Sequence, residues 1–132
     1  MDRLPNHLHA IRIHAAWERM EFRGGSASGP PIKVTLPDES EFDSATDFVV
    51  YSRKFNLPSG LNGTQRVELE CSLLGVASEA TLNEEPISLS VGKTRFDITS
   101  ALRPHNYLQL TIPVHAATNT DLAIARLMIF ES

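Results

Sequence analysis

The fold is decided between Phe48 and Ile112, and most clearly by the run Arg66-Val67-Glu68-Leu69-Glu70-Cys71-Ser72-Leu73. Its apolar residues alternate with polar ones, which indicates a strand with one buried face and one wet face. The earlier run Tyr51-Ser52-Arg53-Lys54-Phe55-Asn56-Leu57-Pro58 alternates similarly and ends at a proline, which cannot donate to a β-ladder. The glycines and asparagine of residues 59–64 favour a turn. We therefore expect two strands joined by a loop, with no helix between them.

Shorter apolar runs lie on both sides of this pair. They predict further strands at residues 11–17 with an extension to Phe22, and at 32–36, 80–83, 87–91, 106–112 and 122–130. Residues 24–31 and 38–47 have the composition of loops. Residues 94–98 lead into one helical turn at 99–102, which Thr99 is expected to cap and Pro104 to stop. No segment of ten or more residues has a helical period, so the sequence predicts an all-β, antiparallel β-sandwich.

The last predicted strand differs from the others because apolar residues occupy both of its parities, from Leu122 to Phe130. Such a strand is either central and covered on both faces, or it presents a surface to a partner. The sequence leaves both possibilities open.

Length and composition limit the class of protein. The 132 residues suit a single domain over 1–132. The net charge of −4 contains no long block of one sign, which disfavours nucleic acid as a partner. No apolar run approaches the roughly twenty residues that cross a bilayer, and the N-terminus lacks the apolar segment of a signal peptide, so we expect no membrane association and a cytoplasmic location. The single cysteine, Cys71, has apolar parity and is expected to be a small buried hydrophobe.

Several short motifs between residues 51 and 108 resemble one protein family in their order and spacing. They are Tyr51-x-Arg53-x-Phe55-x-Leu57-Pro58, Val67-x-Leu69, Ala80-x-Leu82-Asn83, Phe96-Asp97-Ile98-Thr99-x-x-Leu102 and Asn106-x-Leu108. Together they are similar to the N-terminal sugar-binding domain of β-galactosidase and β-glucuronidase type glycoside hydrolases. The resemblance implies a jelly-roll sandwich of the galactose-binding-like type.

The chain departs from that family pattern in two places. The turn that is usually Asn-Gly is Asn83-Glu84 here, and residues 87–95 lack the Gly-Gly-Tyr type loop that reaches towards the substrate in the full enzymes. In those enzymes the catalytic carboxylates belong to a separate barrel domain, for which 132 residues leave no room. The resemblance therefore implies a non-catalytic domain.

Motifs of other chemistries are incomplete. A Gly-x-Ser-x-Gly elbow is missing, and Gly92-Lys93-Thr94 lacks the earlier glycine of a phosphate-binding loop. His7 and His9 share a strand face but have no further ligands to complete a metal site. Asn62-Gly63-Thr64 matches a glycosylation acceptor but more simply marks a turn, and Glu84-Glu85 indicates a solvated turn. The sequence predicts no catalytic residue, no metal and no cofactor.

A sugar site needs an aromatic face for C–H groups and fixed polar side chains for hydroxyls. Candidates beside strand ends, where such sandwiches often carry ligands, are Arg53, Arg95, Arg103, His105 and Tyr107. The alternative for the charged candidates is that they belong to an ordinary solvent-exposed, charged rim of the sandwich. Trp17 is expected in the core, and Asp97 and Thr99 are expected to brace the turn after Phe96.

The leading hypothesis is a binding module that holds a carbohydrate through loops at one end of the sandwich. The alternative is a structural or protein-interaction domain that uses the apolar last strand, for a protein partner or for self-association. A small enzyme is a third and weaker hypothesis.

Overall fold

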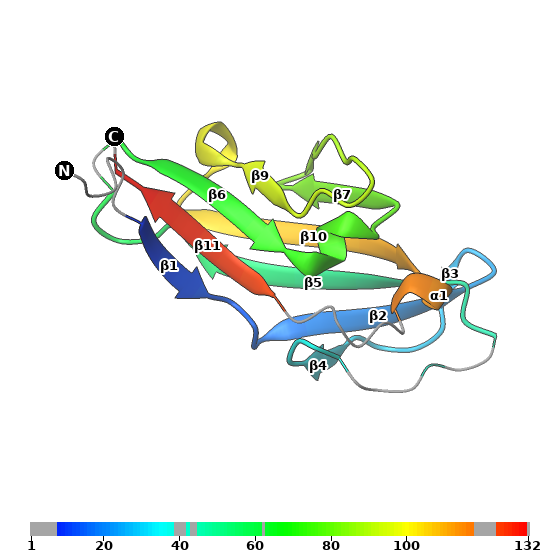
Figure 1. Cartoon of the computed structure of the whole chain (residues 1–132). Coiled ribbons are helices and arrows are strands. Elements are labelled where there is room, and N and C mark those ends of the chain that lie inside the picture. The colour runs from blue at the N-terminus through cyan, green and yellow to red at the C-terminus, as the bar shows by residue number, and fades with distance from the viewer. Residues whose placement is uncertain (1–7, 39–41, 43–44, 62, 118–123, 132) are drawn as a thin grey trace.

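The computed structural model describes residues 8–38, 42, 45–61, 63–117 and 124–131. These residues form two antiparallel β-sheets that face each other across one apolar core (Figure 1). The predicted all-β sandwich is confirmed. Among the described residues, none of the helices is long and apolar enough to cross a membrane.

The sheets differ in size. The four-stranded sheet has the order β1 (Leu8–Arg12), β11 (Ala125–Phe130), β6 (Arg66–Cys71) and β9 (Arg95–Asp97). The seven-stranded sheet has the order β3 (Ser26–Ala27), β2 (Trp17–Arg23), β5 (Phe48–Asn56), β10 (His105–Pro113), β7 (Glu79–Leu82) and β8 (Glu85–Pro86), with β4 (Ile32–Val34) paired to β2. Short helical turns are η1 (Ser72–Gly75), η2 (Thr99–Ala101) and α1 (Val114–Ala117).

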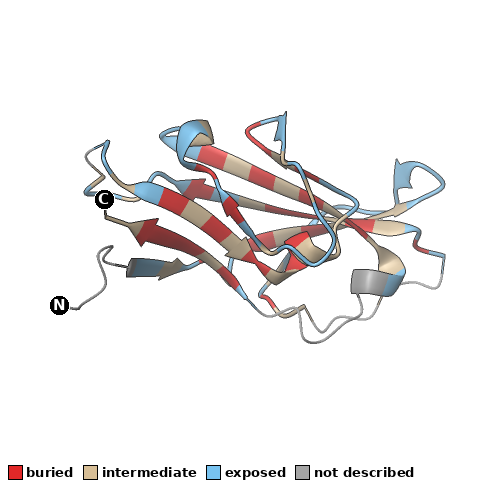
Figure 2. Ribbon diagram, turned by 45° about the horizontal axis from the view of Figure 1, so that its top comes forward, coloured by how far each residue is buried: buried red, intermediate tan, exposed pale blue. Residues whose placement is uncertain are grey.

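The core follows from the period-two pattern of the strands. Along β6 and β10, buried residues alternate with partly exposed ones, as the banding in Figure 2 shows. Each strand thus contributes one apolar face to the space between the sheets, where burial of apolar surface drives folding. Trp17 and Cys71 lie in this core with no exposed surface, as predicted.

The strand predicted from residue 11 to Phe22 is wrong as one element. β1 ends at Arg12 and β2 begins at Trp17, and the two belong to different sheets. Between them the chain crosses the edge of the sandwich, with Ala16 at a φ of 65°. The Trp17 indole donates a hydrogen bond of 2.6 Å to the carbonyl oxygen of Ile13 and so ties this crossing to the core. An alternating pattern does not show which sheet its residues join.

Three further predictions of local structure need correction. Residues 87–91 form no strand, and Val91 is fully exposed. The predicted loop at 24–31 contains the two-residue strand β3. The helical turn after residue 98 is confirmed as η2, but its N-cap is Ile98 and Thr99 caps nothing. Instead the amide and hydroxyl of Thr99 donate to Oδ1 of Asp97 at 2.9 and 2.6 Å, which confirms that this pair braces the turn.

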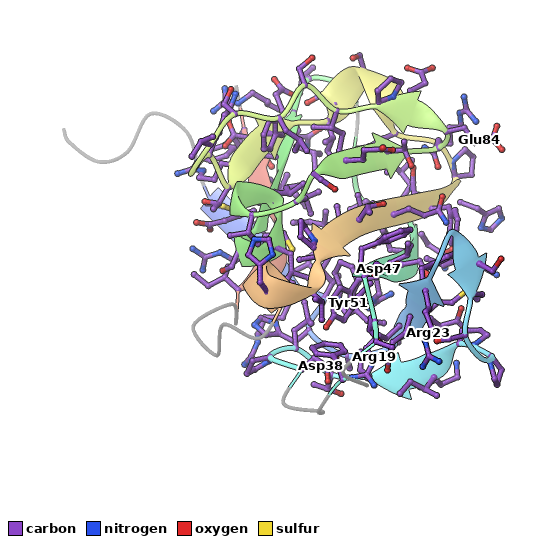
Figure 3. The ribbon with its side chains drawn as sticks, turned by 90° about the vertical axis from the view of Figure 1, so that its right-hand side faces the viewer. Arg19, Arg23, Asp38, Asp47, Tyr51 and Glu84 are labelled. Atoms are coloured by element: carbon purple, nitrogen blue, oxygen red, sulfur yellow. The ribbon has the colours of Figure 1, made fainter. Side chains whose placement is uncertain are left out.

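The hairpin between β7 and β8 contains the Asn83-Glu84 turn. Leu82 pairs with Glu85, so the turn has two residues, and both have positive φ, 54° for Asn83 and 73° for Glu84. Such turns favour Asn-Gly because glycine adopts positive φ without strain. Glu84 lies at the outer edge of the molecule (Figure 3).

The last strand is central. β11 lies between β1 and β6, and its Leu127 and Ile129 face the core. On its other face Met128 is only 4% exposed, and the Arg66 guanidinium lies 4.4 Å from the ring centre of Phe130. β11 therefore carries apolar residues at both alternating positions because both of its faces are covered. Residues 122 and 123 of the predicted strand, like His7 and Asn62, lie outside the described residues.

Candidate functional site

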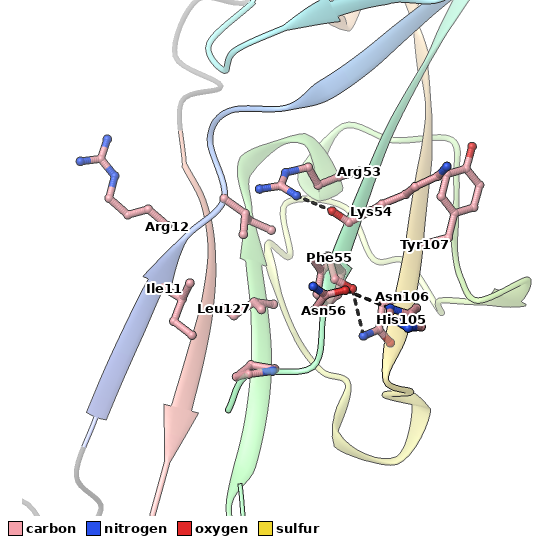
Figure 4. Close-up of a pocket in the computed structure, with 12 residues that line it drawn as sticks. Ile11, Arg12, Arg53, Lys54, Phe55, Asn56, His105, Asn106, Tyr107 and Leu127 are labelled. Carbon is pink, nitrogen blue, oxygen red and sulfur yellow. Dashed lines mark hydrogen bonds between the residues drawn. The ribbon is translucent and has the colours of Figure 1, made fainter. Parts of the chain in front are cut away.

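Two surfaces meet where β5 and β10 lie side by side near one end of the sandwich. The register pairs Leu108 with Arg53 and Tyr107 with Lys54. Because side chains alternate across a strand, Arg53 points between the sheets while Tyr107 points away from them. Figure 4 shows these two side chains on opposite sides of the strands. The side chains of the sequence-predicted residues Arg53 and Tyr107 therefore point in opposite directions, although both residues line the cavity and the depression described below.

The first surface is a cavity of about 740 Å³ between the sheets. We call it the inter-sheet cavity. Its apolar walls include Ile11, Ile13, Phe55 and Leu127. Its size falls within the range of small-molecule sites, roughly 300–1,000 Å³.

Arg12, Lys54 and Arg53 are the arginine and lysine residues of this cavity's lining, and the side chain directed between the sheets is that of Arg53. Its Nη1 donates a hydrogen bond to the carbonyl oxygen of Lys54, and its Nε is buried without a partner. Burial lowers the pKa of Arg53 from its ordinary value. The group nevertheless stays protonated near neutral pH, because the ordinary value is so high.

Asn106 also borders the cavity but is fully engaged in holding the fold. Its amide nitrogen donates to the carbonyl oxygens of Arg103 at 2.7 Å and Phe55 at 3.3 Å. Its Oδ1 accepts from the Arg103 amide at 2.8 Å and from Nδ2 of Asn83 at 3.0 Å. Asn83 in turn accepts from the Tyr107 amide at 2.9 Å. These two amides pin the β7–β8 turn to β10, and the family resemblance gave no structural role to either.

The second surface lies on the outside of the seven-stranded sheet. Strand register places a continuous row of polar side chains across five strands, in the order Lys33, Glu18, Ser52, Gln109 and Thr81. Two further pairs, Lys54 with Tyr107 and Asn56 with His105, continue the same face towards the strand ends. We call these nine residues the polar face. A depression of about 240 Å³ lies within it, and its lining includes Tyr107, Glu18, Lys33, Lys54 and Ser52.

Hydrogen bonds hold the side chains of this face in place. Nε2 of Gln109 donates to the Tyr107 hydroxyl at 3.1 Å. Nδ1 of His105 hydrogen-bonds to Oδ1 of Asn56 at 3.0 Å. The aromatic ring of Tyr107 is thus fixed beside charged and amide groups, an arrangement that suits a ligand with both apolar and hydroxyl surface.

The remaining sequence-predicted residues lie elsewhere. Arg95 is on β9 in the other sheet, where its Nη2 lies 2.8 Å from Oε1 of Glu68. Arg103 is exposed in the turn before β10, with Nη2 4.0 Å from Oε2 of Glu85. The structure therefore brings three of the five predicted residues, Arg53, His105 and Tyr107, to the lining of the inter-sheet cavity, with the Arg53 and Tyr107 side chains on opposite sides of the strands. Arg95 and Arg103 lie away from both surfaces.

A buried polar cluster lies away from these surfaces (Figure 3). Oδ2 of Asp38 accepts from Nη1 of Arg19 at 2.9 Å and from the Tyr51 hydroxyl at 2.8 Å. Burial, together with the hydrogen bond to Asp38, raises the pKa of Tyr51 above its ordinary value. Arg19 also pairs with a second carboxylate, that of Glu21, at 2.9 Å from its Nη2. Because these charges are paired and covered, the cluster secures the chain around Asp38 to β2 and β5.

Within the described part of the chain, no group of three or more His, Cys, Asp or Glu side chains could hold a metal ion. Cys71 is free and buried, and burial raises the pKa of its thiol to about 11, against the smaller effect of hydrogen bonds from the Leu73 and Leu74 backbone. Its thiolate is therefore scarce at neutral pH.

No family model matches the sequence, and no curated protein matches it significantly. Solved structures do match. A β-glucuronidase from Faecalibacterium prausnitzii aligns with 99% of this chain and 32% of its own, at a TM-score of 0.67 and 14% identity. The chain has the fold of one part of such a hydrolase. The resemblance noted in the sequence is thereby confirmed at the level of the fold.

Related enzymes give the same result. A Bifidobacterium dentium β-glucuronidase, solved with coumarin-3-O-glucuronide, aligns with 99% of this chain and 31% of its own, at a TM-score of 0.65 and 17% identity. A putative β-galactosidase from Bacteroides fragilis aligns with 92% of this chain and 23% of its own, at a TM-score of 0.62 and 16% identity. This chain thus spans less than a third of the length of either enzyme.

Part of the site could be read from the sequence and part could not. Arg53 shares its parity with Tyr51 and Phe55, so its inward direction was available from the alternation alone. The polar row could not be predicted from the alternation, because its members come from five strands whose register is set only by the folded sheet.

Proposed function

We propose that this chain is a non-catalytic glycan-binding module that holds its ligand on the polar face. The observation that carries the proposal is Tyr107, an aromatic ring fixed by Gln109 and bordered by the carboxylate of Glu18 and the ammonium groups of Lys33 and Lys54. The ring offers a surface for sugar C–H groups, while the charged groups can accept from and donate to hydroxyls. The glycoside hydrolases among the structural neighbours support this choice of ligand class.

The inter-sheet cavity is less suited to a sugar, although it is larger. Ile11, Phe55 and Leu127 give it apolar walls, and the amide of Asn106 has no hydrogen-bonding capacity to spare. Much of its remaining polar lining, Lys54, Asn56, His105 and Tyr107, also belongs to the polar face. A sugar carries hydroxyls around its whole ring and would leave several of them unpaired there, which costs free energy. The polar face offers hydrogen-bond donors and acceptors for sugar hydroxyls across its whole width.

Two of the sequence-predicted ligand residues, His105 and Tyr107, remain in this proposal. Arg53 lies on the other side of β5, and Arg95 and Arg103 lie outside the polar face, so none of these three is assigned a sugar contact. Contact through strand faces also replaces part of the expected contact through loops.

The test is a titration followed by two-dimensional NMR, with a first panel of β-glucuronides and β-galactosides, the substrates named for the neighbouring enzymes. We expect shifts of polar-face resonances with one sugar class. Tyr107→Ala should weaken binding about tenfold, the typical loss for a stacking aromatic ring and its buried area.

Thr111→Ala is the matched control, because Thr111 is on the same strand and outer face but outside the polar face. It should leave affinity unchanged. An absence of shifts across the panel at millimolar sugar, with wild-type protein that is folded, would contradict the proposal.

Three observations favour the polar face over a partner surface on the last strand. β11 lies between two strands, Met128 is nearly fully covered, and Arg126 lies 2.7 Å from Glu70 on the same face.

A further inference from the structure

The inter-sheet cavity holds a positive charge that no carboxylate balances. The guanidinium of Arg53 reaches into it with Nε buried and unpartnered, and its hydrogen bond goes to the backbone of Lys54. Among the described residues that line the cavity, none is an aspartate or a glutamate.

Arg12 also lines the cavity but is exposed, and five further arginines of the described chain pair with carboxylates. Arg19 also has an unpartnered Nε, but its guanidinium lies 2.9 Å from both Asp38 and Glu21. Ion pairs with glutamates are made by Arg66, Arg95, Arg103 and Arg126. Arg53 is therefore a half-buried cation that differs from these five in lacking an anion.

A half-buried cation without an anion costs free energy in the ligand-free protein. Burial removes water from the guanidinium and disfavours its charged form, which is why the pKa of Arg53 is lowered. The group cannot lose its proton near neutral pH, so the charge remains and calls for an anion. The fork of N–H donors on a guanidinium matches the two oxygens of a carboxylate.

We propose that the inter-sheet cavity binds a small organic carboxylate with an apolar body. The carboxylate accepts from the terminal N–H groups of the Arg53 guanidinium that the Lys54 carbonyl leaves free, and the body packs against Ile11, Phe55 and Leu127. The carboxylate contact differs from the polar-face contact, because Arg53 and Tyr107 point to opposite sides of β5 and β10 (Figure 4), although Lys54, Asn56, His105 and Tyr107 line the cavity as well.

The walls decide between a carboxylate of this kind and a small inorganic anion. Ile11 is partly exposed and forms an apolar wall with the nearly buried Phe55 and Leu127, so a ligand with an apolar body covers more of this wall than a small ion does. Phosphate would gain the contact with Arg53 but would leave the apolar walls facing water or a void, which is unfavourable.

The test uses calorimetric and NMR titration of the full chain with benzoate and hexanoate. Benzamide, phosphate and glucuronate are the comparison ligands, because each lacks either the charge or the apolar body. We expect saturable binding of at least one of the two carboxylates at millimolar concentration or below, with a shift of the Arg53 Nε–H resonance. Benzamide should bind about tenfold more weakly, the loss expected for one charge-assisted pair.

Variants locate the site. Arg53→Gln should weaken benzoate binding about tenfold or more, while Arg103→Gln, an exposed arginine near the same end, should not change it. Arg53→Met should abolish binding and raise the melting temperature of the ligand-free protein, because it removes an unbalanced buried charge. A residue needed only for packing would lower that temperature.

Three results would overturn the proposal. They are the failure of both carboxylates to saturate, equal shifts of the Arg53 Nε–H resonance by benzamide, phosphate or glucuronate, and unchanged benzoate binding in Arg53→Gln. If a variant failed to fold, the Nε–H resonance of the wild-type protein would still decide. Loss of sugar binding to the polar face would not affect this result, since the two sites are tested by different ligands and different residues.

Discussion

At the scale of single residues, Asn106 joins three segments of chain through one buried amide. It is 3% exposed, and both its nitrogen and its oxygen are engaged. We expect Asn106→Ala to lower the free energy of unfolding by about 3 kcal/mol, because each buried polar group left without a partner costs roughly 1–3 kcal/mol.

Urea-induced unfolding followed by Trp17 fluorescence measures this change. Asn56→Ala, an exposed amide at the same end, should stay within about 0.5 kcal/mol of the wild type. A similar small loss for Asn106→Ala would mean that water replaces the amide.

Asp97 gives a prediction about pH. Partial desolvation raises the pKa of its carboxyl, but hydrogen bonds from Thr99 and the charge of Arg66 outweigh this effect, so the pKa is lowered overall. The stabilising contribution is therefore present above the unfolded pKa of about 4 and is lost as the pH falls through the folded value.

The comparison of wild type and Asp97→Asn by thermal unfolding tests this. Asp97→Asn should be less stable at pH 7, by less than about 1 kcal/mol because the carboxyl is largely exposed. The gap should close in acid. A gap that is constant with pH would show that the charge of Asp97 contributes nothing.

At the scale of elements, the β7–β8 hairpin carries strain at Glu84, whose φ is 73°. Glu84→Gly should raise the free energy of unfolding by about 0.5–1 kcal/mol, since a non-glycine residue in the left-handed region costs roughly 1–2 kcal/mol and glycine returns part of that gain as backbone entropy.

The control is Glu85→Gly, one residue later in β8, which should be destabilising because glycine weakens a strand. Urea titration of both variants gives the sign. Equal losses for the two would mean that the turn relaxes around Glu84 without strain.

The elements also show which local signals are reliable. The period-two runs at β5, β6 and β10 predicted strands because each has one face on the core. The run from residue 11 to Phe22 misled, because its two halves enter different sheets with Ala16 at the crossing. Residues 87–91 alternate as well. The Ile87 amide donates a hydrogen bond to the carbonyl oxygen of Ala80 and so continues the pairing by one residue, but the chain beyond it leaves the sheet.

At the scale of the whole molecule, the division of the site into two surfaces depends on long-range pairing. The motifs identified the strands that carry Arg53, His105 and Tyr107, and their parity separates Arg53 from Tyr107. The polar row needed the register of β4, β2, β5, β10 and β7 together, and the cavity needed the second sheet. Neither is local in sequence, so neither could be predicted from spacing.

Cys71 makes the closure of the sandwich measurable. It has no exposed surface, it lies on β6 between the core and η1, and burial raises its thiol pKa to about 11. A disulfide reagent at pH 8 should therefore react only with molecules in which the sheets have separated. The labelling rate should rise with urea as steeply as the unfolding equilibrium does, because both report exposure of the same surface. A urea-independent rate would instead show that β6 and η1 open locally while the two sheets stay packed.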